Sequence, residues 1–220
     1  MKYITIQQLL ESTSGGTLEE QVDEAAQWIT RNAQPWLTAV DHNIMEHKLF
    51  RGSYARQHSE SYEDTDNWTV RNVRTNRTPR GMNETQMATW EKYISDAGMI
   101  ANRRNSWMTT GNHADTLRFG STNIVIPMGE FNYTWVDGIG DANDWYWSEI
   151  QSMEGRVLDH VQMERFYDGE FEFDIKGDDN SLIEAISSGA EIMLHPTSQK
   201  AALFDPRFIR DVVAHMRDDK

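Results

Sequence analysis

The sequence predicts an α+β fold in one domain over residues 1–220, with a helical N-terminal part (1–46) and a strand-rich core (47–220). Three observations favour this class. Apolar residues make up 38% and charged residues 25%, a composition typical of globular proteins. Helical spacing of apolar residues dominates the beginning and the end of the chain. Short runs of β-branched and aromatic residues fill the middle.

The best-defined helix start is Thr17-Leu18-Glu19-Glu20. It has the pattern of a capping box, in which a threonine and a glutamate three residues later bond the free amides of a helix start. Apolar residues then follow at helical spacing, and Pro35 ends the helix because proline disfavours a helical residue before it. Further helical segments are expected at 3–11, 36–45, 82–97 (capped by Asn83), 114–119, 180–186 (capped by Asn180) and 204–216.

Strands are expected where apolar residues form short runs or alternate with polar ones. Segment 56–81 is poor in apolar residues and is expected to be a long irregular segment that contains one strand. Segment 137–144 is expected to be a loop, and 153–166 fits a helix or a strand equally well. The expected strands are 47–54, 68–70, 107–110, 123–128, 131–136, 171–175 and 191–194.

Composition excludes several classes of site. The chain has no cysteine, which rules out disulfides, thiolate zinc sites, iron–sulfur clusters and a thiol nucleophile. The histidines His42 and His47 lack the spacing of a zinc helix, and 137–144 lacks that of a calcium loop, so no metal is expected. There is no signal-peptide pattern and no run of the ~20 apolar residues that a membrane span needs. A soluble, cytoplasmic protein without a membrane partner is therefore expected.

The net charge of −14 is distributed unevenly. Residues 51–111 hold nine basic and seven acidic residues, whereas residues 128–191 hold three basic and sixteen acidic ones. Strong non-specific binding of nucleic acid is not expected, because contacts with phosphates dominate that affinity. A small ligand that carries phosphate would prefer the arginines of the first segment. The acidic segment would suit a basic protein partner, or it simply keeps the protein in solution.

Three short motifs place polar residues at the ends or edges of strand-like runs. They are Phe50-Arg51-Gly52, Met108-Thr109-Thr110-Gly111 and Glu191-Ile192-Met193-Leu194. A guanidinium binds phosphate oxygens through a fixed fork of donors, and hydroxyls orient a ribose or a carboxylate. A carboxylate stabilises the cationic sugar that develops when a glycosidic bond breaks. The three motifs thus supply the groups that cleavage of a dinucleotide at a sugar requires.

In this order the motifs resemble the Arg…Ser-Thr-Ser…Glu pattern of mono-ADP-ribosyltransferases, including phage-encoded members, over residues 51–194. The resemblance implies a strand-rich core of two small packed sheets around an NAD cleft. It implies an NAD-dependent transferase that cuts the nicotinamide–ribose bond and passes ADP-ribose to a macromolecular acceptor, expected to be a protein. For a phage-encoded protein, the expected location is the host cytoplasm or the virion.

The resemblance also implies roles for individual residues. Glu191 would stabilise the oxocarbenium-like transition state, and Thr109 would orient Glu191 and the ribose. The guanidinium of Arg51 would hold the phosphate or ribose of NAD, and Phe119 would stack on nicotinamide. The residues expected to bind NAD are Arg51, Gly52, Thr109, Thr110 and Phe119.

Two glycines depart from the family pattern. Gly111 stands where the last serine of Ser-Thr-Ser is expected, so one orienting hydroxyl is missing. Gly189 stands two residues before Glu191, where family members that modify arginine and similar side chains carry Gln or Glu. The usual means of activating an arginine acceptor is therefore absent, and hydrolysis of NAD or an unusual acceptor also fits.

Two alternatives stay open. Glu170-Phe171-Glu172 is a literal Glu-x-Glu on an expected strand, which makes Glu172 a second candidate for the catalytic glutamate and allows a glycosidase with paired carboxylates. The departures at Gly111 and Gly189 also fit a catalytically silent, acidic virion or interaction protein with a degenerate ADP-ribosyltransferase fold.

Overall fold

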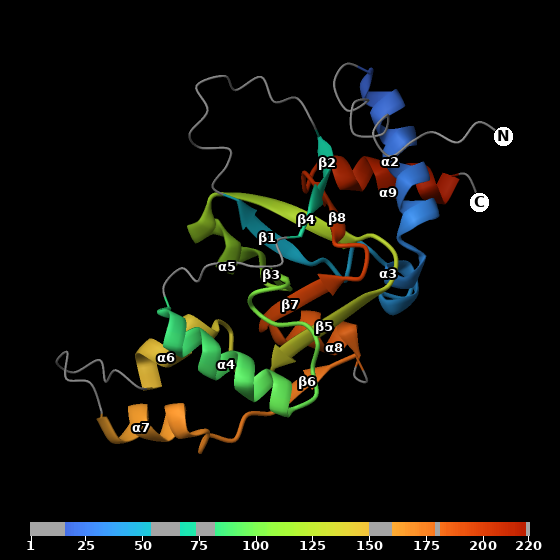
Figure 1. The fold of residues 1–220 in the computed structure, drawn as a ribbon. Coiled ribbons are helices and arrows are strands. Elements are labelled where there is room, and N and C mark those ends of the chain that lie inside the picture. Colours follow the sequence, from blue (N-terminus) through green and yellow to red (C-terminus); the bar gives the residue numbers. More distant parts are fainter. Residues whose placement is uncertain (1–15, 54–66, 74–81, 150–159, 179–180, 219–220) are drawn as a thin grey trace. The chain divides into compact units, whose positions relative to one another are not determined.

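The computed structural model describes residues 16–53, 67–73, 82–149, 160–178 and 181–218 (Figure 1). It confirms the α+β class. The chain divides into two compact units, each built from separated stretches. The first unit comprises residues up to 72 together with 113–131 and 196–220, and the second comprises 73–112 and 132–195. The expected helix at 3–11 lies outside the described residues.

The first unit contains four strands in the order β2-β8-β4-β1. Its three strand pairs are antiparallel, and Phe204 at the end of β8 lies opposite Trp68 on one side and Ile124 on the other. Strand β8 therefore occupies the middle of this group, although the sequence did not predict it. The strands are β1 (Phe50–Ser53), β2 (Trp68–Asn72), β4 (Ser121–Pro127) and β8 (Lys200–Phe204).

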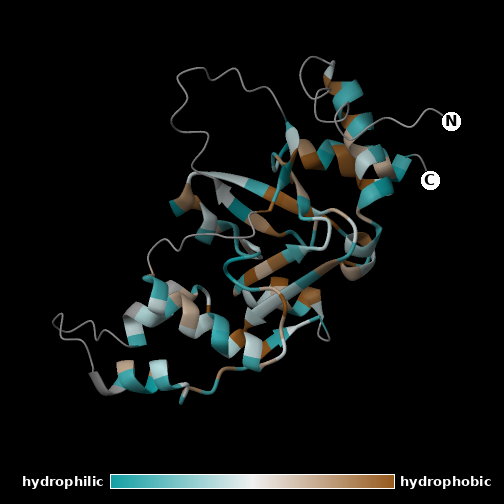
Figure 2. Cartoon of the chain, in the orientation of Figure 1, coloured by the Kyte–Doolittle hydropathy of each residue, from teal (hydrophilic) through white to brown (hydrophobic). Residues whose placement is uncertain are grey.

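Helices from opposite ends of the chain complete the first unit. The predicted capping box is confirmed, because the Thr17 and Glu20 side chains bond each other's backbone amides. Helix α2 contacts α9, and the Trp28 ring of α2 lies 6.0 Å from the ring of Trp68. The apolar residues of α9 stand out in Figure 2. The helices are α2 (Leu18–Asn32), α3 (Gln34–Ala39), α5 (His113–Thr116), the 3₁₀ helix η2 (Leu117–Phe119) and α9 (Phe208–Asp218).

The second unit contains four strands in the order β3-β7-β5-β6. The pairs β3–β7 and β5–β6 are antiparallel. This order places the strand of the second motif beside the strand of the third. The strands are β3 (Trp107–Thr110), β5 (Phe131–Val136), β6 (Ile175–Gly177) and β7 (Glu191–Pro196).

An aromatic cluster forms the core of the second unit. The Trp90 ring is 1% exposed, and it lies 5.4 Å from the ring of Trp145, 5.7 Å from that of Phe166 and 4.7 Å from that of Phe173. Such rings contribute large buried areas and edge-to-face contacts. The helices of this unit are α4 (Glu84–Asp96), α6 (Ala142–Glu149), α7 (His160–Asp168) and α8 (Leu182–Ser188).

A lysine balances part of the acidic segment. The Lys176 ammonium lies 3.1 Å from carboxylates of Asp137 and Glu184, 3.5 Å from Asp174 and 4.9 Å from the centre of the Trp135 ring. The hydrogen bond to Asp137, followed by that to Glu184, raises the pKa of Lys176. These ion pairs thus offset part of the negative charge in this part of the sequence.

Several expected elements differ from the structure. The strand expected at 171–175 is wrong except at Ile175, because pairing with β5 begins only there, opposite Val136. The helix expected at 36–45 ends at Ala39, and Asp41 and His42 take positive φ angles. The ambiguous segment is helical from 160 onward, and its earlier part lies outside the described residues. None of the helices in the described ranges is both long and apolar enough to cross a membrane.

High pH is expected to destabilise the protein through Tyr167. Burial, and then the hydroxyl bond to Tyr146 (3.2 Å), raises the pKa of Tyr167 from 10.0 to about 12. The folded state therefore favours the neutral phenol, so its contribution to stability is complete below pH 10 and is lost as pH rises to about 12. Denaturant unfolding across this range should show a weaker pH dependence in Tyr167→Phe. An unchanged pH dependence would contradict this assignment.

Candidate active site around Glu191

The second unit brings the second and third motifs together. In the antiparallel pair β3–β7, Thr110 lies directly opposite Glu191. Side chains of directly opposed residues share one face of a sheet, with Cβ atoms about 4.5–5.5 Å apart. The structure thus places a hydroxyl-bearing residue next to the candidate catalytic carboxylate.

Thr109 has a different place. It pairs with Ile192, so its side chain leaves the sheet on the face opposite to Thr110 and Glu191. The Thr109 hydroxyl is buried and donates to the carbonyl oxygen of Ile192 at 2.9 Å. This bond ties β3 to β7. Of the two threonines, Thr110 is therefore the one that lies beside Glu191.

The start of β7 is fixed by the end of α8. Gly189 caps the C-terminal end of the helix in the left-handed conformation (φ 72°), which glycine adopts readily. The Thr110 hydroxyl donates to the carbonyl of Gly189 at 3.2 Å and accepts from the amide of Asn112 at 3.0 Å. These bonds hold the chain two residues before Glu191 against the end of β3.

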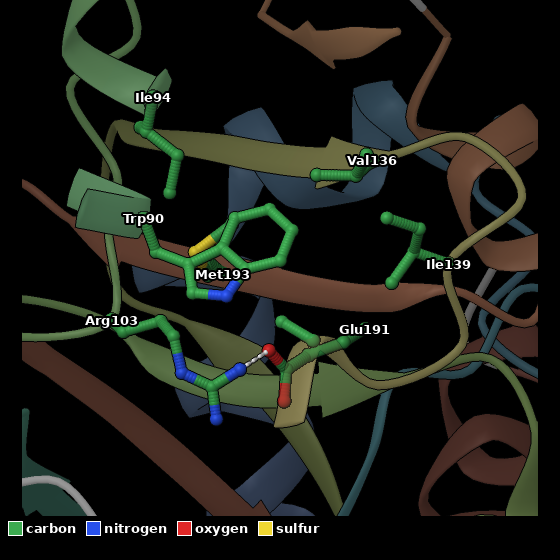
Figure 3. A pocket seen from close by; sticks show the side chains of 8 residues that line it. Trp90, Ile94, Arg103, Val136, Ile139, Glu191 and Met193 are labelled. Atoms are coloured by element: carbon green, nitrogen blue, oxygen red, sulfur yellow. Dashed lines mark hydrogen bonds and ion pairs between the residues drawn. The ribbon is translucent and has the colours of Figure 1, made fainter. Parts of the chain in front are cut away.

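Glu191 forms an ion pair with Arg103, whose guanidinium bonds the Glu191 Oε1 atom. Each side chain is only 13% exposed. The pair borders a small pocket of about 10 Å³ whose other walls are apolar, as Figure 3 shows. This volume accommodates about one water molecule. The apolar lining residues are Trp90, Ile94, Val136, Ile139, Ala142 and Met193.

Trp90 adds a polar atom to this pocket. Its indole N–H is buried and has no hydrogen-bond partner among the described residues. In Figure 3 this nitrogen points to the side of the pocket where Arg103 and Glu191 lie. The pocket therefore combines a neutral donor, a cation and an anion with apolar walls.

The first unit holds the remaining expected site residues. Arg51 is half-buried on β1 opposite Asn123 of β4. A Cβ atom on Gly52 would collide with the Cβ of Phe119 and lie 2.6 Å from the carbonyl oxygen of Thr116. Only glycine allows the turn before β4 to approach β1 this closely. The structure thus brings Gly52 and Phe119 together within the first unit.

Phe119 is accessible for stacking. Its side chain is 38% exposed, and the guanidinium of Arg118 lies 4.8 Å from the centre of its ring. An exposed aromatic ring beside a cation is suited to a flat or phosphate-bearing ligand.

The alternative motif Glu170-Phe171-Glu172 has an environment that suits a catalytic carboxylate less well than that of Glu191. Glu170 and Glu172 are exposed and lie in an irregular segment, not on a strand. Glu170 pairs with Arg165 at 3.3 Å, and the intervening Phe171 packs on the aromatic cluster. The pattern is therefore explained by a partly buried phenylalanine between two exposed acidic residues.

Comparison of the chain with protein-family models, with curated proteins and with solved structures finds no match. The described residues contain no group of three or more His, Asp or Glu side chains that could hold a metal ion.

Arg103 and Trp90 are the site residues that the sequence did not identify. Arg103 is one of many arginines in the middle of the chain, and Trp90 lies on the apolar face of a predicted helix. The sequence Asn102-Arg103-Arg104-Asn105 does indicate that Arg103 lies in a turn. Asparagines at both ends of a short segment favour a tight turn with side-chain hydrogen bonds.

Proposed function

We propose that this protein is an NAD-dependent mono-ADP-ribosyltransferase in which Glu191 is the catalytic carboxylate. The observation that supports the proposal best is the pairing of Thr110 with Glu191 on adjacent strands. It joins a hydroxyl and a carboxylate from motifs far apart in the sequence. The limited exposure of Glu191 adds to this, since a charge acts more strongly in a site with little water.

In the proposed reaction, the bond between ribose C1′ and the nicotinamide nitrogen breaks, and its electron pair leaves with neutral nicotinamide. Glu191 stabilises the oxocarbenium-like sugar that forms. The acceptor then bonds C1′ and releases its proton to solvent. A protein acceptor is part of the proposal.

The proposal also assigns roles to other residues. Thr110 takes the role of orienting Glu191 and the ribose, and Thr109 supports it by tying β3 to β7. Arg51 is proposed to bind the phosphate or ribose of NAD, and Gly52 positions Phe119 to stack on nicotinamide. The proposal includes the finer fold assignment, an ADP-ribosyltransferase-like core.

Glu191→Gln is expected to lower NAD cleavage about a thousandfold, because it removes the negative charge that stabilises the transition state. Nicotinamide release and transfer of labelled ADP-ribose to lysate proteins measure the effect. Glu172→Gln is the matched control and should keep full activity, since Glu172 is exposed. Unfolding curves of each variant exclude loss of fold. Equal activity of Glu191→Gln and the wild type would reject the role of Glu191.

A second candidate function is a catalytically silent interaction protein. The observation that favours it is the size of the pocket beside Glu191, which is too small for a nicotinamide ring. Catalysis therefore requires the Arg103–Glu191 pair to open or NAD to bind along the exposed edge of Glu191. Calorimetry with NAD separates the candidates, because an enzyme binds NAD and a silent protein gives no heat of binding.

A further inference from the structure

The turn between α4 and β3 is fixed by its own side chains. The Asn102 side chain accepts from the amides of Arg104 (3.0 Å) and Asn105 (3.2 Å), and the Asn105 side chain accepts from the amide of Asn102 (2.8 Å). The Asn105 amide group also donates to the carbonyl of Ile100 at 2.9 Å. The carbonyl of Asn105 lies 2.7 Å from a ring nitrogen of His195 on β7. The backbone that carries the two arginines is therefore held in place.

This turn directs two adjacent arginines to different carboxylates. Arg103 pairs with Glu191 on β7, and both side chains are largely buried. Arg104 pairs with Glu84 and, at 2.8 Å, with Glu91, both on α4, and its side chain is 31% exposed. Only Arg103 reaches the pocket. The two arginines thus form a natural pair for comparison.

We propose that Arg103 is a positioning residue for Glu191. This inference rests on the proposed function. A glutamate side chain has several rotatable bonds, and a carboxylate placed about 1 Å away from its productive position loses much of its effect. Arg103 bonds the Glu191 Oε1 atom from a fixed turn, so it selects one orientation of the carboxylate at the start of β7. Charge-assisted hydrogen bonds of this kind are stronger than neutral ones.

The test compares Arg103→Gln with Arg104→Gln in the full-length protein, with NAD as substrate. Arg103→Gln should lower kcat for nicotinamide release about tenfold to a hundredfold with little change in KM. Arg104→Gln should keep the wild-type kcat. On a Glu191→Gln background, Arg103→Gln should cause no further loss, because the two residues act as a unit.

Chemical rescue separates positioning from a merely structural role. Millimolar guanidinium should restore part of the activity of Arg103→Ala and leave the activity of Arg104→Ala unchanged, because only the first variant lacks a cation beside Glu191. Equal kcat for the wild type and Arg103→Gln, or activity lost without rescue, overturns the inference while leaving the proposed function intact. A wild-type protein that releases no nicotinamide overturns both.

Discussion

Replacing Gly111 with serine is expected to destabilise the second unit strongly, although it would restore the hydroxyl that the family pattern has at this position. A Cβ atom on Gly111 would collide with the carbonyl oxygen of Ile186 and lie 2.6 Å from its carbonyl carbon. These are backbone atoms of α8, so no side-chain rotation relieves the contact. Overpacking that must be absorbed by the backbone should cost about 3 kcal/mol or more.

Denaturant unfolding of Gly111→Ser and Gly140→Ser measures this effect. Gly140 is the matched control, because a Cβ atom there meets no atom within 4 Å and its φ angle is not in the left-handed region. Gly140→Ser should therefore unfold near the wild-type midpoint. A stable Gly111→Ser with increased NAD cleavage would contradict the expectation and show that α8 yields easily.

This contact explains one departure from the Ser-Thr-Ser pattern in physical terms. The end of α8 lies so close to the end of β3 that only glycine fits between them. The same arrangement lets the Thr110 hydroxyl bond the carbonyl of Gly189. A missing hydroxyl at position 111 is thus linked to the packing that sets the start of β7 and the place of Glu191.

Trp90→Ala is expected to lower the free energy of unfolding by about 3–5 kcal/mol. The Trp90 ring lies in contact with three other aromatic rings and is 1% exposed, so its removal leaves a large cavity in the core of the second unit. Circular dichroism is a suitable way to follow unfolding, because removing one of the eight tryptophans changes the fluorescence signal.

Trp90→Phe provides the control for this prediction. It keeps an aromatic ring in the cluster and removes an indole N–H that has no partner among the described residues. An unpaired buried donor lowers the free energy of unfolding, so removing it offsets part of the stability lost with the packing contacts. The phenylalanine variant should therefore lose much less stability than the alanine variant. Similar losses in the two variants would show that the polar atom, not the packing, determines the stability here.

The local elements of the fold were predictable from the sequence. The capping boxes at Thr17 and Asn83 fix the starts of α2 and α4, and the predicted strand at 107–110 coincides with β3. Such signals involve neighbouring residues only. Strand β8 was missed because Lys200-Ala201-Ala202-Leu203 has helical rather than β propensity, and its strand form comes from pairing with β2 and β4.

The candidate site was predictable only in part, for a similar reason. The sequence shows a hydroxyl motif and a glutamate strand, but the register that sets Thr110 rather than Thr109 beside Glu191 is a tertiary property. The partner of Glu191 was equally hidden, because an arginine in a turn carries no sign of the carboxylate it will bind. The aromatic alternation at 171–173 was misleading, since those rings pack inward without a neighbouring strand.

The interleaving of the two units has a consequence for synthesis on the ribosome. Every segment of the second unit precedes residue 196, whereas the first unit needs β8 for the middle of its strand group and α9 as the partner of α2. Helix α2 is synthesised before its partner α9, so the face of α2 that contacts α9 stays uncovered until α9 emerges from the ribosome. We therefore expect the second unit to fold first during translation, and a chain stopped near residue 196 would leave the first unit without the strand that joins β2 to β4.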